Sequence, residues 1–376
     1  MDLFNFADEF GPAKIIHIYE PAVGLKGILV VDNVAMGPAI GGVRIAPDVS
    51  VEECFRLARA MTFKNAAAGL AHGGGKMVIY GDPKMPKEQK QRLMRAAAAS
   101  LRNEQSYIFG PDMGTNEECM AWVRDENGRS VGLPREIGGI PLDEIGATGW
   151  GILHATEIAL HQQNHSLTGA TVAIQGFGSV GKHAARFLAE RGAKIIAAND
   201  SCGTIYNPKG LNIMALFKLK EEGRSVAEFA DGTPLDRDEI IDIECNIWIP
   251  AARPDVINED NVHRLKARLI VQGANIPITY GAEKILFDKG VVCIPDFIAN
   301  AGGVICAAME YHGATAIAAL QAIEEKIIQN TETVLEISRR KNILPREAAT
   351  ELASERIKKA MSFRRWSLFS SAPHFI

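Results

Sequence analysis

The sequence predicts an α/β fold in two domains, with a helical segment at the C-terminal end. A chain of 376 residues is usually divided into two domains. From residue 150 onward, apolar strand-like runs alternate with amphipathic helical runs, which is typical of a parallel sheet covered by helices. The stretch 128–149 is crowded with glycine and proline, which predicts a connector between the domains.

The first domain is expected over residues 1–145 and should be of the α/β type. β-Branched and apolar runs predict strands, and helical periodicity predicts helices. The predicted elements are strands 26–32 and 77–80 and helices 51–69 and 86–103. Ser50 followed by Glu53 forms a capping-box pattern, so the first helix should begin there.

The second domain is expected over residues 146–310, and the remaining residues, 311–376, should be mostly helical from 312 to 360. The predicted elements of the second domain are helix 150–163, strand 171–175, helix 180–191, strand 194–199, helix 211–221, strand 245–249, strand 268–272, helix 281–289 and strand 291–294. The C-terminal helices are expected to pack back on the first domain or to bridge the two domains, and the end, 362–376, should be a disordered or lightly packed tail.

Composition and charge exclude several classes of protein. The net charge of −4 gives no reason to expect nucleic acid or an anionic membrane as a partner, and no apolar run reaches the roughly 18 residues that a membrane span needs. The first ten residues carry acidic and no basic side chains, which does not fit a secretory signal, so a cytoplasmic protein is expected. The six cysteines are scattered, which predicts free thiols and no metal site.

A glycine pattern in the second domain predicts a dinucleotide site of the Rossmann type. Gly176, Gly178 and Gly181 follow a predicted strand and open a predicted helix, in the spacing that binds a pyrophosphate. The first glycine allows a tight turn, the second a close approach of the phosphates, and the third close packing of helix on strand. The predicted cofactor-binding residues are Gly176, Phe177, Gly178, Ser179, Val180, Gly181, Asp200 and Ala251.

Asp200 ends the next predicted strand, 24 residues after Gly176. A carboxylate at this place can accept hydrogen bonds from the ribose hydroxyls of adenosine and would repel a 2′-phosphate. The sequence therefore favours NAD, with NADP as the alternative because Ser201, Lys182 and Lys209 lie nearby in the chain.

Two lysines of the first domain stand in a setting rich in glycine and alanine. Lys64 and Lys76 are twelve residues apart, and Lys76 directly follows three glycines and precedes an apolar run. A turn before a strand would explain this pattern structurally, whereas glycines also let a substrate come close. A lysine held away from water can act as an acid or base near neutral pH, so Lys76 is a candidate catalytic residue.

Eight motifs in order make the chain resemble the glutamate/leucine/phenylalanine/valine dehydrogenase family. They are IGGVR at 40–44, MTFKNA at 61–66, GGGK at 73–76, PDMGT at 111–115, GATGWG at 146–151, QGFGSVG at 175–181, QGAN at 272–275 and PDFIANAGGV at 295–304. The resemblance implies oxidative deamination of an L-amino acid to its 2-oxo acid and ammonia, a reversible reaction. It also implies a homo-oligomer that assembles through the first domain.

The resemblance also implies roles for single residues of the first domain. Lys76 would polarise the carbonyl of the oxo acid and activate water against the imine. Asp112 would move protons to and from the amino group. Lys64 would bind the substrate α-carboxylate, helped by the backbone around Gly41 and Gly42. In the second domain Asn300 would lie near the substrate amino group, and Thr148 and Asn275 near the nicotinamide.

Two positions depart from the pattern of the glutamate-specific members. Those members carry a lysine before the first GG and a serine seven residues after the asparagine of NAGGV, and both bind the γ-carboxylate. Here the positions hold Ile40 and Ala307. A buried carboxylate without a partner costs several kcal/mol, so an apolar pocket of Ile40, Met61 and Ala307 would favour a branched-chain or aromatic amino acid.

Two alternatives to this specificity stay open from the sequence. The connector at 137–151 looks more like that of the glutamate enzymes, which leaves a glutamate dehydrogenase with a rearranged pocket. A non-catalytic nucleotide-binding regulator is the other alternative, although such a protein has no need of Lys64, Lys76 and Asp112 together.

Overall fold

The computed structural model describes residues 5–363 and divides the chain into two compact units. Unit 1 consists of the described parts of Met1–Pro141, Val304–Ala319 and Glu351–Ile376, and unit 2 of Leu142–Gly303 and Leu320–Thr350. The division is discontinuous, whereas the sequence suggested three contiguous ranges. The reason is that three helices near the C-terminus each begin in one unit and end in the other, and helical periodicity does not report which core a helix joins.

Unit 1 is built on a five-stranded sheet in the order β1-β2-β4-β3-β5. The pairs β1/β2 and β2/β4 are antiparallel, and β3 is parallel to both β4 and β5. The strands are β1 (Lys14–Glu20), β2 (Leu25–Asn33), β3 (Ala39–Ala46), β4 (Gly73–Tyr80) and β5 (Tyr107–Pro111). The glycines before Lys76 thus belong to strand β4 itself and not to a turn before it.

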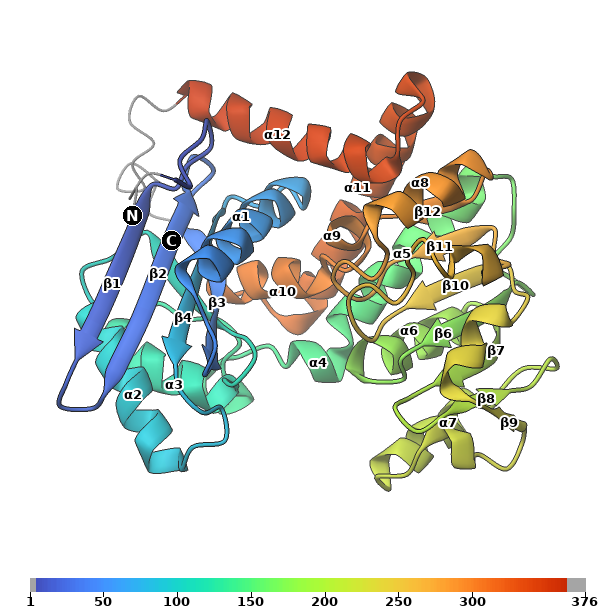
Figure 1. Cartoon of the computed structure of the whole chain (residues 1–376), viewed down its shortest axis with the longest axis horizontal. Helices are drawn as coiled ribbons and strands as arrows, with labels where there is room; N and C mark the ends of the chain where they lie inside the picture. Colours follow the sequence, from blue (N-terminus) through green and yellow to red (C-terminus); the bar gives the residue numbers. More distant parts are fainter. Residues whose placement is uncertain (1–4, 364–376) are drawn as a thin grey trace. The chain divides into compact units, whose positions relative to one another are not determined.

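Helices cover both faces of this sheet (Figure 1). They are α1 (Val51–Ala67), α2 (Lys87–Ser100) and α3 (Glu117–Asn127), and the short helix η1 (Arg135–Ile137) follows them in the chain. Ile28 and Val30 pack with α1, whereas Leu29 and Val31 face the core that α2 and α3 complete. Alternate residues of one strand thus enter opposite cores, which explains the continuous apolar run in β2. Helix α1 begins as predicted, because Ser50 Oγ accepts the N–H of Glu53 at 3.1 Å.

Unit 2 is built on a seven-stranded sheet in the order β12-β11-β10-β6-β7-β8-β9. The strands from β12 to β7 are parallel, and β8 and β9 add an antiparallel edge. The strands are β6 (Thr171–Gln175), β7 (Lys194–Asn199), β8 (Thr204–Tyr206), β9 (Thr233–Leu235), β10 (Ile247–Pro250), β11 (Leu269–Val271) and β12 (Val292–Ile294). The predicted parallel sheet of a Rossmann-type domain is therefore confirmed.

The helices of unit 2 follow the strands in the alternation that the sequence predicts. They are α4 (Leu142–Ile145), α5 (Ala147–Gln162), α6 (Ser179–Glu190), α7 (Ile213–Glu221), α8 (Tyr280–Asp288) and α9 (Asp296–Ala299), with short turns η2 (Val226–Glu228), η3 (Arg237–Asp242) and η4 (Val262–Arg264). Gly149 lets α5 approach α6 closely, because a Cβ atom there would lie 2.7 Å from the backbone nitrogen of Ala184.

Three helices end the described chain: α10 (Gly302–Tyr311), α11 (Ala316–Lys341) and α12 (Pro345–Phe363). The end of α12 packs on α1, where Arg356 Nη1 donates to the carbonyl of Ala67 at 2.7 Å, so this segment packs back on the first domain as predicted. The middle segment, 320–350, belongs to unit 2 instead. The predicted tail lies outside the described residues from 364 onward. Within residues 5–363, no helix is long and apolar enough to cross a membrane.

Candidate active site

Glycines in β3 let a lysine and a carboxylate meet in unit 1. A Cβ atom on Gly42 would lie 2.7 Å from the Cβ of Asp112 and 3.1 Å from Nζ of Lys76. Gly41 is equally restricted, since a Cβ atom there would lie 1.7 Å from the carbonyl oxygen of Gly75. The Tyr107 hydroxyl donates to the carbonyls of Gly41 and Gly42 at 2.7 and 3.1 Å. The strand that would hold a substrate carboxylate is therefore fixed against its neighbours.

Lys76 and Asp112 form an ion pair, with 2.5 Å between Nζ and Oδ2. Their side chains are 7% and 23% exposed, so the pair is largely shielded from water. Burial by itself raises the pKa of Asp112, but Lys76, Arg44 and the N–H of Met113 outweigh burial and leave this pKa below its usual value. Asp112 is thus held ionised beside a buried ammonium group, which is a suitable arrangement for two proton carriers.

Arg44 is a third charged member of this cluster, and the sequence analysis did not single it out. Its Nε donates to Asp112 Oδ2 at 3.1 Å, and its Nη1 donates to Glu53 Oε1 at 2.6 Å. In the sequence, Arg44 is marked only as the last residue of the IGGVR motif. A partner on another element, 68 positions away in the chain, cannot be read from spacing.

The other residues predicted to bind substrate occupy three elements of unit 1. Ile40 is buried in β3, at 4% exposure. Met61 and Lys64 are half-buried on α1, which lies close to β4 because Gly74 has no side chain. Ala307 is half-buried on α10.

Glu310 ties helix α10 to the connector. Its carboxylate accepts the N–H groups of Leu133 and Ile140 at 3.1 and 2.8 Å. Burial raises the pKa of Glu310. This contact sets the position of the helix that carries Ala307, and no pattern in the sequence predicted it.

The glycine turn of unit 2 has the geometry that a pyrophosphate requires. Gly176 has a φ of +98°, which disfavours other residues, and a Cβ atom on Gly181 would lie 1.8 Å from the carbonyl of Gly176. A Cβ atom on Gly178 would instead meet nothing within 4 Å, so this position faces open space. The first helical bond of α6 runs from Lys182 N to Gly178 O, which leaves the N–H groups of Ser179 and Val180 without a helical acceptor.

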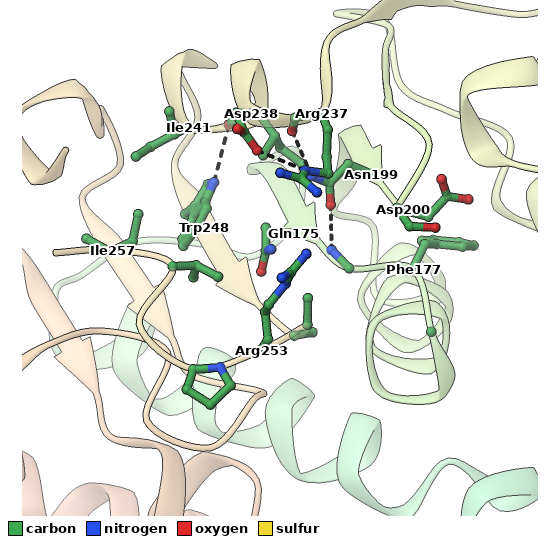
Figure 2. A pocket seen from close by; sticks show the side chains of 18 of the residues that line it. Gln175, Phe177, Asn199, Asp200, Arg237, Asp238, Ile241, Trp248, Arg253 and Ile257 are labelled. Carbon is green, nitrogen blue, oxygen red and sulfur yellow. Dashed lines mark hydrogen bonds and ion pairs between the residues drawn. The ribbon is translucent and has the colours of Figure 1, made fainter. Parts of the chain in front are cut away.

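A cavity with a volume of about 700 Å³ opens beside this turn. Of the predicted cofactor residues, Gly176, Phe177, Gly178, Asp200 and Ala251 line it. Figure 2 shows Trp248 and Ile257 on one side, Asn199, Asp200 and Phe177 on the other, and Arg253 and Gln175 between them. The turn and the cavity fit a dinucleotide, whereas Thr148 and Asn275 are not among the residues that line this cavity.

Asp200 is engaged by four donors of its own unit. Its Oδ1 accepts from Cys202 N and Ser225 Oγ at 3.0 and 2.8 Å, and its Oδ2 from Val226 N and Lys220 Nζ at 2.9 and 2.8 Å. Burial raises the pKa of Asp200, but these donors outweigh burial and lower it to about 2. A ribose hydroxyl would have to share oxygens already in use, and Lys220 already balances the charge that would repel a 2′-phosphate.

This arrangement predicts a structural role for Asp200. At neutral pH, Asp200→Asn should lower the free energy of unfolding by about 1–3 kcal/mol, since an amide cannot accept from all four donors. Because the folded pKa is lowered to about 2, the stabilisation is present above about pH 4 and is lost as the pH falls toward 2. Urea titrations across that range measure it.

Asp238→Asn is the matched control, because Asp238 lines the same cavity but is 77% exposed and pairs with its neighbour Arg237. Its effect should stay within about 0.5 kcal/mol. Equal stability of Asp200→Asn and the unmodified protein at pH 7 would contradict the structural role.

Asn275 and Asn300 lie together in unit 2. Asn300 Nδ2 donates to Asn275 Oδ1 at 3.0 Å, while Asn300 Oδ1 is buried and has no hydrogen-bond partner among the described residues. That oxygen is a candidate acceptor for a bound ligand. Thr148 is the second residue of helix α5 in the same unit and lies next to Gly303, where a Cβ atom would be 3.3 Å from Thr148 Oγ1.

A buried ionic network supports the two asparagines, and sequence reasoning missed it. Arg346 of α12 donates to both carboxylate oxygens of Glu283, at 2.7 and 2.9 Å, and to Asp296 at 2.8 Å. It also donates to Gln272 at 2.8 Å. Gln272 begins the QGAN motif and Asp296 accepts the N–H of Ile276, so the network joins the segments that carry Asn275 and Asn300.

The two units have the parts of a dehydrogenase. One has a Rossmann-type sheet with a glycine turn suited to a dinucleotide, and the other holds a lysine and a carboxylate out of water. Among the described side chains, no group of three His, Cys, Asp or Glu is placed to hold a metal ion.

Known proteins agree with this class. The model of the glutamate/leucine/phenylalanine/valine dehydrogenase family matches residues 138–365, and that of its dimerisation domain matches residues 14–129. A glutamate dehydrogenase of Aeropyrum pernix is 38% identical, over 89% of this chain and 85% of its own length. An NADP(+)-dependent glutamate dehydrogenase of Pyrobaculum calidifontis is 34% identical, over 91% and 87%.

Among solved structures, the L-tryptophan dehydrogenase of Nostoc punctiforme superimposes with a TM-score of 0.75 at 25% identity, over 94% of this chain and 98% of that one. The chain belongs to the glutamate/leucine/phenylalanine/valine dehydrogenase family. It is an amino-acid dehydrogenase that uses a nicotinamide dinucleotide, NAD or NADP, and acts as a homo-oligomer on small molecules. The alternative of a non-catalytic regulator is set aside.

Proposed function

We propose that this chain catalyses the reversible oxidative deamination, with NAD or NADP, of an L-amino acid with an apolar side chain. The buried pair of Lys76 and Asp112, 2.5 Å apart beside Gly42, carries the proposal for the chemistry. Two proton carriers of opposite charge in one shielded place meet the needs of a reaction in which an amine, an imine and water exchange protons.

The residues of unit 1 would bind and deprotonate the substrate. Lys64 and the backbone at Gly42 hold the α-carboxylate, and Asp112 takes a proton from the substrate ammonium group. A bound nicotinamide dinucleotide would supply the acceptor for the hydride that leaves the α-carbon. Lys76 then assists the addition of water to the imine, and Asp112 returns a proton to the departing ammonia. Asn300, with its unpartnered buried oxygen, would contact the substrate amino group.

The two residues predicted to contact the substrate side chain support an apolar substrate. Ile40 is 4% exposed in β3, and Ala307 is half-buried on α10. Neither side chain can donate a hydrogen bond to a γ-carboxylate, and leaving a carboxylate unpaired in such surroundings costs several kcal/mol. The names of the relatives do not decide the matter, because they include both glutamate and tryptophan dehydrogenases.

Glutamate is the second candidate substrate. The two relatives at 38% and 34% identity are both glutamate dehydrogenases, and their resemblance covers most of the chain. For glutamate to be the substrate, a cation other than one at position 40 would have to pair with the γ-carboxylate.

A panel of L-amino acids tests the proposal. Leucine, isoleucine, valine, phenylalanine or tryptophan should exceed glutamate in kcat/KM by at least about 10²-fold, because an unpaired charge costs more than a misfit methylene. The measurement is the initial rate of NADH or NADPH formation for each amino acid, at saturating concentration of whichever dinucleotide the enzyme reduces faster. If glutamate is the best substrate, the interpretation of Ile40 and Ala307 fails.

A further inference from the structure

Arg44 shares one carboxylate oxygen with Lys76. Oδ2 of Asp112 accepts from Lys76 Nζ at 2.5 Å and from Arg44 Nε at 3.1 Å. The Arg44 side chain is 21% exposed and also pairs with Glu53 at 2.6 Å, so it is held from both ends. Its backbone lies in β3, two residues beyond Gly42, and Gly42 lies directly against Asp112 and Lys76.

The two cations next to Asp112 differ in what they do during a reaction. An ammonium group can lose its proton and can turn toward a substrate oxygen or a water molecule. A guanidinium stays charged at every working pH and keeps a fixed geometry. When Lys76 engages the substrate, Arg44 is therefore the cation that remains beside Asp112.

We propose that Arg44 is a positioning residue of the reaction, which fixes the carboxylate of Asp112 and supplies the counter-charge that persists when Lys76 turns to the substrate. This inference rests on the proposed function of Lys76 and Asp112 as proton carriers. Glu53 completes the arrangement, because it balances Arg44 from the side away from Asp112 and prevents an excess of positive charge.

The other titratable groups around Asp112 do not change charge near neutral pH. Tyr107, on strand β5, is fully buried, and burial raises its pKa well above the usual value. Burial also raises the pKa of Cys54 on α1 to about 12. Burial by itself lowers the pKa of Arg44, but the carboxylates of Asp112 and Glu53 outweigh burial and raise this pKa. The charged groups that contact one another here are those of Lys76, Asp112, Arg44 and Glu53.

The pH profile of kcat/KM tests the role of Arg44, because loss of a nearby cation raises the proton affinity of the catalytic pair. In Arg44→Met the acid limb of this profile, where kcat/KM falls as the pH is lowered, should move to higher pH by about one unit or more. The value of kcat/KM at pH 7 should fall at least about 10-fold. Arg44→Lys should return the limb to within about 0.3 unit, since a single donor makes the contact to Asp112. The KM for the dinucleotide should change less than about 3-fold in both variants.

Two variants serve as controls. Arg56→Met removes an exposed arginine from α1 and should leave the acid limb in place. Glu53→Gln keeps Arg44 but removes its balancing charge, so the limb should move slightly to lower pH, by less than about 0.5 unit. A purely structural role of Arg44 would lower kcat without moving the limb, and that result would overturn the proposal.

The rates are measured with whichever amino acid the unmodified enzyme oxidises best. The comparison of the Arg44 variants is therefore still valid if the proposed substrate class is wrong. If the acid limb of the pH profile does not move in Arg44→Met, only the proposed role of Arg44 is overturned. If Arg44→Met does not fold, as judged by circular dichroism, Arg44→Gln takes its place, because a neutral amide also removes the counter-charge: an acid limb about one pH unit higher supports the proposal, and an unmoved limb overturns it.

Discussion

Lys76→Ala should lower the kcat of oxidative deamination by at least about 10²-fold, as expected for the loss of a positioned proton carrier. The side chain is 7% exposed, so bulk water is poorly placed to substitute for its ammonium group. Binding of NADH, followed by its fluorescence, should stay near that of the unmodified enzyme, because the glycine turn lies in the other unit. Lys64→Ala should act mainly through KM, because it removes a contact to the substrate that is already present in the ground state.

Asp112→Asn should have an effect of the same size, since an amide keeps the shape but cannot carry the proton. Lys87→Ala is the matched control for charge, because Lys87 is 64% exposed and pairs with Glu118 on the surface of the same unit. Its kcat should be unchanged. Near-full activity of either Lys76→Ala or Asp112→Asn would remove that residue from the mechanism.

The second large effect concerns specificity. The double change Ile40→Lys with Ala307→Ser should move the ratio of kcat/KM for glutamate over the best apolar amino acid by at least about 10²-fold toward glutamate. The lysine would supply the missing counter-charge, and the serine a second polar group to fix its geometry. Ile40→Lys alone should gain less, because a lone ammonium in a buried strand position also costs free energy.

Ile40→Leu is the control for this experiment, since it conserves volume and adds no charge. It should leave glutamate as poor a substrate as before. The measurement is the same panel of initial rates, with thermal melting to establish that the double variant is folded. No gain for glutamate in the double variant would show that positions 40 and 307 do not contact the γ-carboxylate.

The sequence predicted well where the physical cause is local. Strands 171–175 and 194–199 agree with β6 and β7 residue for residue, because short β-branched runs between glycines and polar residues are self-contained signals. The glycine turn was predicted for the same reason, and the structure shows why Gly176 and Gly181 have to be glycine. The hydrogen bond by which Ser50 caps α1 is likewise local, because it joins residues only three positions apart in the chain.

Two strands of the site were missed. β3 and β5 carry Ile40, Gly41 and Gly42 and lead into Asp112, but their glycines and prolines resemble loop sequence. They form strands because β4 pairs with β3, and β3 with β5, which is a property of the whole sheet. The glycines that concealed the strands are those that let the backbones and the catalytic side chains come close.

The sequence by itself determined the α/β class, the dinucleotide turn, the candidate lysines and the family resemblance. Only the tertiary structure decided that Asp200 is engaged by donors from 20 to 26 residues away, that Arg44 meets Asp112, and that Arg346 joins Glu283, Asp296 and Gln272. The physical reason is the range of the interactions. Propensity and turn geometry act over a few residues, whereas a buried charge must find its partners wherever folding brings them, because leaving it unpaired costs several kcal/mol.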